Sequence, residues 1–584
     1  MLDPRIYRAA FVPVLLAIVA LAFSFYDQQG PLGTSLAPDA FNAQNAWATM
    51  NGLSRNYPNR LPGSPSDTAL AGRVAQILGR HGFVVATDVS SGRTAQGTRT
   101  LETVTGQRAG FSSRAIVVVA HRDSLGSTAT ADMSGTATLL ELARVLSGRT
   151  LRRTVILAST SGSIGGAGAL RLAHRLAGSV DAVLVLGDLA SARVRDPIVV
   201  PWSDGQALAP PALRNTIGAA LGAQAGLRPG TIGLAGQFAH LAFPTTPTEQ
   251  GAFGQQGEPA VLLSASGERP PAADAPVSLD RLSAFGRTAL QSITALEDGP
   301  AVPGPSAYLV YDGKVIPGWA IRILVLTLIL PVLAVAIDGY ARARRRGVAV
   351  GRWFGVIVAS AVPFGLVVGL LVGLKQTGLM KIAPPEPVET TSVVPHAAGI
   401  AILVSIVCVL VGSIALMRPW LARLARRRGA TAGGAIVATP LVMCATAIAV
   451  WVGHPFAAAL IVPALNLWVW VMAPEASLPR SVRWALVLVG FVPFVLIAVY
   501  YAVTLGLGPV DLAWSAAMML AGGHIGVFSA LAWSLLLGCA AVVVGVALQA
   551  TRVRSEGELP ITVRGPATYA GPGSLGGTES ALRR

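Results

Sequence analysis

A histidine and an aspartate, His121 and Asp123, follow the apolar run Ala115–Ala120. Because this run is rich in β-branched residues, it predicts a buried β-strand that ends at the pair. A neutral imidazole is a common metal ligand, and a nearby carboxylate can hold its ring in the required orientation. The spacing therefore predicts the site of a metal-dependent hydrolase, or what is left of one, at the end of a strand.

The composition indicates a membrane protein. The chain has 584 residues, 52% of them hydrophobic, which is too apolar for a purely soluble enzyme and too long for one domain. The formal net charge is +16, and arginines gather between apolar runs, at residues 342–346 and 418–428. Such clusters are typical of cytoplasmic loops. The charge therefore predicts contact with lipid headgroups of a bilayer and argues against a nucleic-acid partner.

Eight apolar runs are long enough to cross a bilayer. The first, Ala9 to Phe25, is interpreted as an uncleaved anchor, with a cleavable signal peptide as the alternative. The other seven lie near residues 317–338, 352–374, 397–417, 434–453, 456–473, 484–504 and 525–549. The arginine distribution then places both termini in the cytoplasm. Few lysines beside abundant Ala, Gly and Arg suggest a bacterial cell membrane.

The predicted domains are residues 1–29, the N-terminal end and anchor; 30–305, an extracytoplasmic domain; 306–550, a seven-helix membrane domain; and 551–584, a disordered cytoplasmic tail. Within 30–305, strand-like runs alternate with helix-like stretches, which predicts an α/β sheet with helices on both faces. The strand-like runs are Ala115–Ala120, Thr154–Ala158, Ala182–Leu186 and Ala260–Leu263. The moderately apolar segment 511–523 is interpreted as a re-entrant or interfacial segment, which leaves the number of membrane spans open. All three cysteines lie in apolar runs, so the soluble domain has no disulfide or cysteine metal site.

Several short segments of this domain occur in a characteristic order: Arg60-Leu-Pro-Gly63-Ser64-Pro65, Glu102 to Gly110, the His121-Arg-Asp123 strand end, Ser134-Gly135 before a helix, and Glu258-Pro-Ala-Val261. Together they resemble the M28 family of zinc aminopeptidases. The resemblance implies an α/β zinc-peptidase fold and a site with two zinc ions. In that family a glutamate acts as general base on the metal-bound water.

The resemblance implies a role for four residues. His121 matches the first zinc ligand, and Asp123 matches the carboxylate that orients it. Asp188 matches a second ligand of the same metal. Asp132 is a possible third, although it stands one residue from the family's position, which Ala131 takes when no gap is allowed. One residual zinc held by His121, Asp132 and Asp188 is therefore conceivable.

The rest of the family's machinery is missing. Ser163 and Ile164 stand where the general base and a glutamate ligand are expected, and Gln250 replaces the last histidine. Loss of a general base alone typically costs about 10²–10⁴-fold in rate. His240 is a potential replacement ligand, but a lone histidine among apolar residues is more often a core residue. The alternative to any metal is that His121 is a leftover and that Asp188 caps a turn.

The sequence therefore predicts a catalytically degenerate M28-like protein, a scaffold that binds an envelope protein or a peptide. The order of its parts is similar to the luminal-domain subunit of the glycosylphosphatidylinositol transamidase. The alternative is an active membrane-bound zinc aminopeptidase with a divergent site. A third interpretation, a transporter, is supported only by the number of predicted membrane helices.

Overall fold

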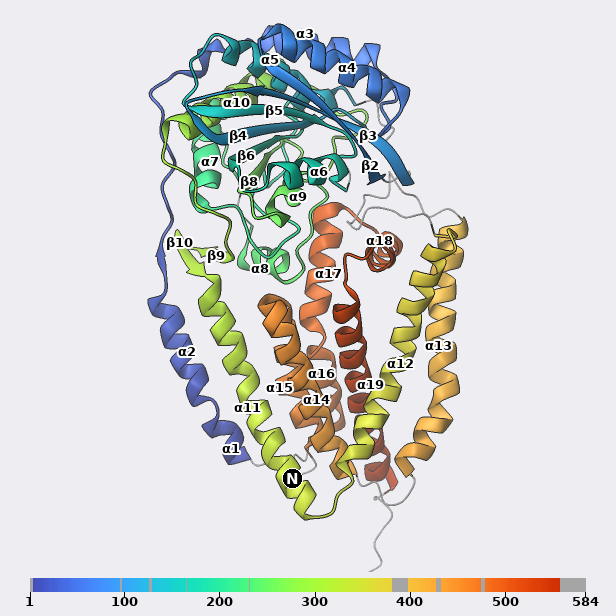
Figure 1. Cartoon of the computed structure of the whole chain (residues 1–584). Coiled ribbons are helices and arrows are strands. Elements are labelled where there is room, and N and C mark those ends of the chain that lie inside the picture. Colours follow the sequence, from blue (N-terminus) through green and yellow to red (C-terminus); the bar gives the residue numbers. More distant parts are fainter. Residues whose placement is uncertain are drawn as a thin grey trace, which may run out of the picture.

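An α/β domain stands on a bundle of long helices in the computed structural model (Figure 1). The structure describes residues 4–94, 97–124, 129–163, 165–230, 232–380, 397–426, 432–473 and 478–556. Ile164 lies outside these residues, as does the predicted tail from residue 557 onward.

The α/β domain is built around a seven-stranded sheet with the order β2-β3-β5-β4-β6-β8-β7. Its strands are β2 (Val84–Thr94), β3 (Gly97–Arg108), β4 (Ser112–His121), β5 (Arg153–Thr160), β6 (Val180–Leu186), β7 (Val199–Val200) and β8 (Ala260–Leu263). The central strands β5, β4, β6 and β8 are parallel, and the outer pairings are antiparallel. The central strands contain the four predicted apolar runs, because parallel strands are buried on both faces.

Helices cover both faces of the sheet. One face packs on α3 (Ala43–Asn56), α4 (Pro65–Arg80), α5 (Ser134–Ser147), α7 (Pro211–Ala225) and α10 (Leu279–Asp298). The other packs on α6 (Ala167–Leu176), α8 (Leu234–Ala242) and α9 (Gln250–Gln255). Alternate residues of β4 serve the two cores: Ile116 and Val118 face the first, and Val117 and Val119 the second. The predicted fold class, an α/β sheet with helices on both faces beside an all-helical region, is confirmed.

The described part of the chain has seven helices long and apolar enough to span a membrane, and a bent pair that makes an eighth span if its two helices count as one. They are α1 (Pro4–Ala9) with α2 (Val12–Phe23), α11 (Gly318–Arg345), α12 (Val350–Gln376), α13 (Ala397–Arg426), α14 (Ala432–Gly453), α15 (Pro455–Met472), α19 (Val527–Glu556), and the pair α16 (Arg480–Val489) and α17 (Val492–Leu505), bent by 49°. Each coincides with one of the eight predicted runs. The chain is a membrane protein. The segment predicted as re-entrant or interfacial forms α18 (Pro509–Gly522), which lies beside the α/β domain (Figure 1).

A small second sheet joins the anchor to the bundle. Strand β1 (Tyr26–Asp27), directly after α2, pairs with β10 (Lys314–Pro317), and β10 pairs with β9 (Tyr308–Tyr311). The domain boundaries expected at residues 29/30 and 305/306 stay predictions.

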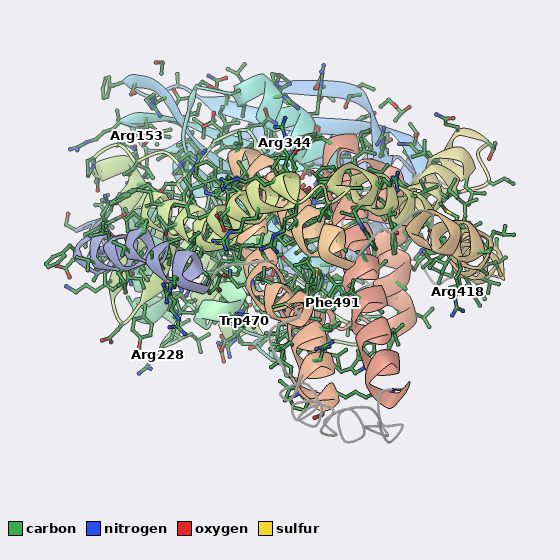
Figure 2. The ribbon with its side chains drawn as sticks, turned by 90° about the horizontal axis from the view of Figure 1, so that it is seen from below. Arg153, Arg228, Arg344, Arg418, Trp470 and Phe491 are labelled. Carbon is green, nitrogen blue, oxygen red and sulfur yellow. The ribbon has the colours of Figure 1, made fainter. Side chains whose placement is uncertain are left out.

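The basic ends of the helices lie opposite the α/β domain. Helix α1 and the last turn of α11, with Arg342, Arg344 and Arg345, are at that end (Figure 1). In the view from below, Arg344 and Arg418 lie well apart, over different helices (Figure 2). Basic side chains are therefore spread across this end of the bundle.

Candidate functional site

The predicted site residues follow the carboxyl ends of neighbouring parallel strands. His121 is the last residue of β4 and is in register with Thr160, the last residue of β5. On the other side, Ala120 is in register with Leu186, the last residue of β6, and Asp188 comes two residues later. Because carboxyl ends of parallel strands meet at one edge of a sheet, this edge is where such folds place ligands.

His121 pairs directly with Asp132. The two atoms His121 Nε2 and Asp132 Oδ1 lie 3.1 Å apart. Asp132 belongs to the short 3₁₀ turn Thr130–Met133, which leads straight into α5. The start of α5 is held against β6, since a Cβ atom on Gly135 would lie 2.6 Å from the carbonyl oxygen of Leu186. The sheet edge therefore fixes the position of Asp132.

A buried arginine stands on the other side of Asp132. Arg60 is 1% exposed, and its Nη2 lies 3.8 Å from Asp132 Oδ2. Its Nε donates to the carbonyl of Arg122 at 3.1 Å and its Nη1 to that of Tyr57 at 2.9 Å. Burial lowers the pKa of Arg60, while the charges of Asp132, Asp123 and Asp67 oppose that shift. A fixed guanidinium thus supplies positive charge to this group of carboxylates.

Asp123 is engaged with Ser163. The carboxylate accepts hydrogen bonds from the Ser163 amide, at 3.0 and 3.2 Å, and from its hydroxyl, at 3.0 Å. Burial raises the pKa of Asp123 to about 6, against the nearby charge of His121. In the position where the resemblance places a general base, this chain has a hydroxyl that donates to the orienting carboxylate.

Asp188 closes its own turn. Its Oδ1 accepts from the amides of Ala190, at 2.9 Å, and Ser191, at 3.0 Å, and its Oδ2 accepts from the hydroxyl of Ser266. Both carboxylate oxygens are therefore occupied by local donors. This is the turn-capping arrangement that was the alternative to a metal ligand.

Glu249 is a further acid of this site. It is 2% exposed, and its Oε1 accepts from the hydroxyl of Thr160, while Oε2 is buried without a hydrogen-bond partner. Burial raises the pKa of Glu249 to about 7, and the charge of His121 opposes the shift. Glu249 thus lies close enough to His121 for their charges to interact.

The surrounding acids determine the charge of His121. Burial lowers its pKa, but the hydrogen bond to Asp132 and the charges of Asp132, Glu249 and Asp123 outweigh burial and raise the pKa to about 9. His121 is therefore protonated at neutral pH. A metal ion that bound His121 would have to displace this proton.

The side chains as arranged do not fit a zinc ion. His121 Nε2 is used by Asp132, and both oxygens of Asp188 are used by its turn and by Ser266. Among the described residues, no three His, Cys, Asp or Glu side chains are grouped so that they could hold a metal ion. The structure brings the two predicted ligands His121 and Asp132 together, and their side chains contact each other directly.

No protein-family profile matches the chain. No curated protein matches its sequence. Solved structures do match. A glutaminyl cyclase of Porphyromonas gingivalis is 16% identical and covers 44% of this chain and 98% of its own, with a TM-score of 0.32. A leucine aminopeptidase precursor of Bacteroides thetaiotaomicron is 13% identical, covers 44% and 97%, and has a TM-score of 0.34. A zinc aminopeptidase from Bacillus subtilis is 12% identical, covers 43% and 94%, and has a TM-score of 0.34.

These similarities concern the fold alone. The α/β sheet with helices on both faces is confirmed, and membership of the M28 family stays a prediction. Similarity to the transamidase subunit stays a prediction.

Two site residues were not predicted from the sequence. They are Glu249, which directly precedes Gln250, and Arg60, which stands in one of the segments that carry the family resemblance. Position gave a signal for Glu249, because it directly precedes the place of a missing ligand. His240, in contrast, lies elsewhere: its ring nitrogens contact Tyr500 and Tyr501 of α17.

Proposed function

We propose that this protein is a membrane-bound, peptidase-like scaffold that binds a peptide or an envelope protein and does not cleave it. The observation that carries the proposal is the direct contact of 3.1 Å between His121 Nε2 and Asp132 Oδ1. The nitrogen that would ligate a metal ion in a peptidase contacts a carboxylate, and the protonated ring forms an ion pair with it. This pairing supports a scaffold without a metal ion.

The absence of a general base at position 163 supports the same conclusion. Amide hydrolysis needs a base within hydrogen-bond reach of the attacking water. The hydroxyl of Ser163 is too weak a base to take the proton of that water, and it donates its own hydrogen to Asp123. Asp123 itself is 1% exposed and is held by two donors of one residue.

The same residues can hold a ligand. The side chain of His121 is 18% exposed, so its charged ring can be reached from outside. A protonated imidazole backed by the buried guanidinium of Arg60 presents hydrogen-bond donors and positive charge. This arrangement suits an acceptor such as a peptide carbonyl or carboxylate.

The proposed setting is a bacterial cell membrane, with both termini cytoplasmic and the α/β domain outside. The arginine-rich helix ends opposite the domain support this orientation. Protease accessibility of the α/β domain in spheroplasts tests it. The bilayer is the first partner, and an envelope protein or peptide is the second.

Metal content and turnover test the scaffold function. The full-length protein, purified in detergent, is assayed for zinc and for hydrolysis of aminoacyl-anilides, together with His121→Ala. His174→Ala is the matched control, because His174 is an exposed histidine of α6. We expect zinc well below one equivalent and no turnover in any of the three. Zinc near one equivalent with turnover that only His121→Ala abolishes would overturn the proposal.

One observation favours the alternative, an active zinc aminopeptidase with a divergent site. Glu249 offers a buried oxygen without a partner, beside His121, on a carboxylate whose pKa burial raises to about 7. Such a group has the pKa of a general base. Turnover lost in Glu249→Gln but kept in Glu258→Gln would support this alternative.

A further inference from the structure

A second group of buried polar residues lies where the α/β domain meets the membrane helices. We call it the interface cluster: Trp202, Asp204, Thr246, Gln250 and Glu268. One residue joins its two acids. The amide of Thr246 donates to Asp204 Oδ1 at 2.8 Å, and its hydroxyl donates to Glu268 Oε1 at 2.7 Å. Neither carboxylate forms an ion pair with an arginine or lysine among the described residues.

Three polar atoms of the cluster are buried without a close hydrogen-bond partner: the acceptors Glu268 Oε2 and Gln250 Oε1, and the donor Trp202 Nε1. Glu268 is 6% exposed and Gln250 is 0% exposed, and the indole N–H of Trp202 is near enough to the Glu268 carboxyl to lower its pKa. Glu268 and Gln250 are each anchored by their other atom. Gln250 Nε2 donates to the Thr246 hydroxyl at 3.1 Å and to the carbonyl of Trp202 at 3.4 Å. Since buried acceptors are almost always satisfied, Gln250 Oε1 points to a further donor, and the Glu268 carboxylate, with Trp202 and Thr246 as donors, still has acceptor capacity beside it.

Aromatic rings form the adjoining wall. His240 stacks on Trp202 with ring centroids 4.1 Å apart. Its Nε2 lies 3.1 Å from the hydroxyl of Tyr500 and its Nδ1 3.2 Å from that of Tyr501, both in α17. Burial lowers the pKa of His240 to about 3, so this ring is neutral and brings no positive charge to the carboxylates. Tyr501 is close enough to Glu268 and Asp204 to interact with their charges.

We propose that the interface cluster binds a primary ammonium group. An ammonium has three N–H donors, and the cluster offers Glu268 Oε2, Gln250 Oε1 and the carboxylate of Asp204 as acceptors. Aromatic rings beside the acids favour an organic cation, which they attract through their faces. A calcium ion, in contrast, takes six to eight oxygen ligands. The proposal goes beyond the scaffold function and does not depend on whether the His121 site is catalytic.

The cluster lies at the junction of the domain with α17. Asp204 of the cluster and the adjoining Tyr500 of α17 are partly exposed, whereas the other cluster members are buried. Nearby, Arg269 Nε donates to the carbonyl of Thr504 at 2.7 Å, which holds the loop after Glu268 against the end of α17. The ammonium can therefore come from two sources, an amine headgroup of the adjacent leaflet or a soluble amine such as a peptide terminus.

The charge state of the empty cluster agrees with this proposal. Burial raises the pKa of Asp204 to about 7, and the charge of Glu268 adds to that shift. Burial likewise raises the pKa of Glu268 to about 7, although the hydrogen-bond donors Thr246 and Trp202 oppose the shift. A bound cation would favour the ionised forms of both.

Thermal unfolding of the full-length protein in nanodiscs tests the proposal. The lipids are phosphatidylglycerol, which has no amine; phosphatidylethanolamine, which has a primary ammonium; and phosphatidylcholine, whose ammonium has no N–H donor. Ethanolamine and calcium chloride are each titrated into the phosphatidylglycerol discs. Each condition is repeated with Glu268→Gln and Asp204→Asn, and with the matched control Asp274→Asn, which changes an exposed aspartate of the same loop.

A higher midpoint in phosphatidylethanolamine than in both other lipids identifies a lipid source, and a rise with ethanolamine identifies a soluble source. Either supports the proposal if Glu268→Gln or Asp204→Asn weakens the apparent affinity about tenfold or more and Asp274→Asn leaves it unchanged. Equal effects of phosphatidylcholine, a response to calcium alone, or amine effects that both cluster variants retain would overturn it.

Discussion

The amide and the hydroxyl of Ser163 both donate to one carboxylate oxygen of Asp123, each at 3.0 Å. Ser163, which the family resemblance places at the position of a general base, thus supports the neighbouring carboxylate. Because Asp123 is 1% exposed, it has few other ways to satisfy its charge. Loss of a hydrogen bond to a buried charged group typically costs about 1–3 kcal/mol.

Ser163→Ala should therefore destabilise the α/β domain by about 1–3 kcal/mol at pH 8. The loss should shrink at pH 5, because the pKa of Asp123 is about 6 and the neutral carboxyl needs its donors less. Chemical unfolding of the full-length protein at the two pH values measures both effects. A loss that is equal at pH 5 and pH 8 would contradict this account of Asp123.

The central strands and the spans could be predicted from the sequence, because a buried parallel strand and a membrane helix are both continuous apolar runs. The pairing of His121 with Asp132 could not. Residue types suggested two ligands of one metal, whereas the direct contact depends on where the turn before α5 places the carboxylate. The aromatic wall beside the interface cluster could not be predicted either, since Tyr500 lies 260 residues from His240 in the sequence.

The His121 pair gives stability with a definite pH dependence. The folded-state pKa of His121, about 9, lies above its ordinary value of 6.5, so the pair contributes its full stability below about pH 6.5. That contribution, on the order of 2–3 kcal/mol, is lost as the pH rises through about 9. Asp132→Asn should remove most of this slope in unfolding measurements between pH 6 and pH 10. A slope that persists in the variant would assign it to other groups.

Glu268 should behave in the opposite way to His121, because its charged form destabilises the folded protein. Its folded pKa of about 7 is raised above the ordinary value of 4.5, so the folded state loses stability as the pH rises from about 4.5 through 7. In amine-free phosphatidylglycerol, Glu268→Gln should therefore be more stable than the unchanged protein at pH 8, by up to about 3 kcal/mol, and similar to it at pH 4.5. Asp274→Asn, an exposed control, should show neither effect. Destabilisation by Glu268→Gln at pH 8 would show that the carboxylate is satisfied without a ligand.

The start of α5 should tolerate no side chain beyond hydrogen at Gly135. A Cβ atom there would lie 2.6 Å from the carbonyl oxygen of Leu186 and 2.7 Å from that of Gly187, and backbone atoms cannot move aside cheaply. Gly135→Ala should push α5 and the neighbouring Asp132 away from the sheet edge, at a cost of about 1–3 kcal/mol. Gly148→Ala, just after the same helix, meets no atom within 4 Å and is the matched control. Because the shift also lengthens the contact between Asp132 and His121, only Gly135→Ala should lower the pKa of His121 in a histidine titration followed by NMR. An unchanged pKa together with lost stability would mean that α5 yields without moving Asp132.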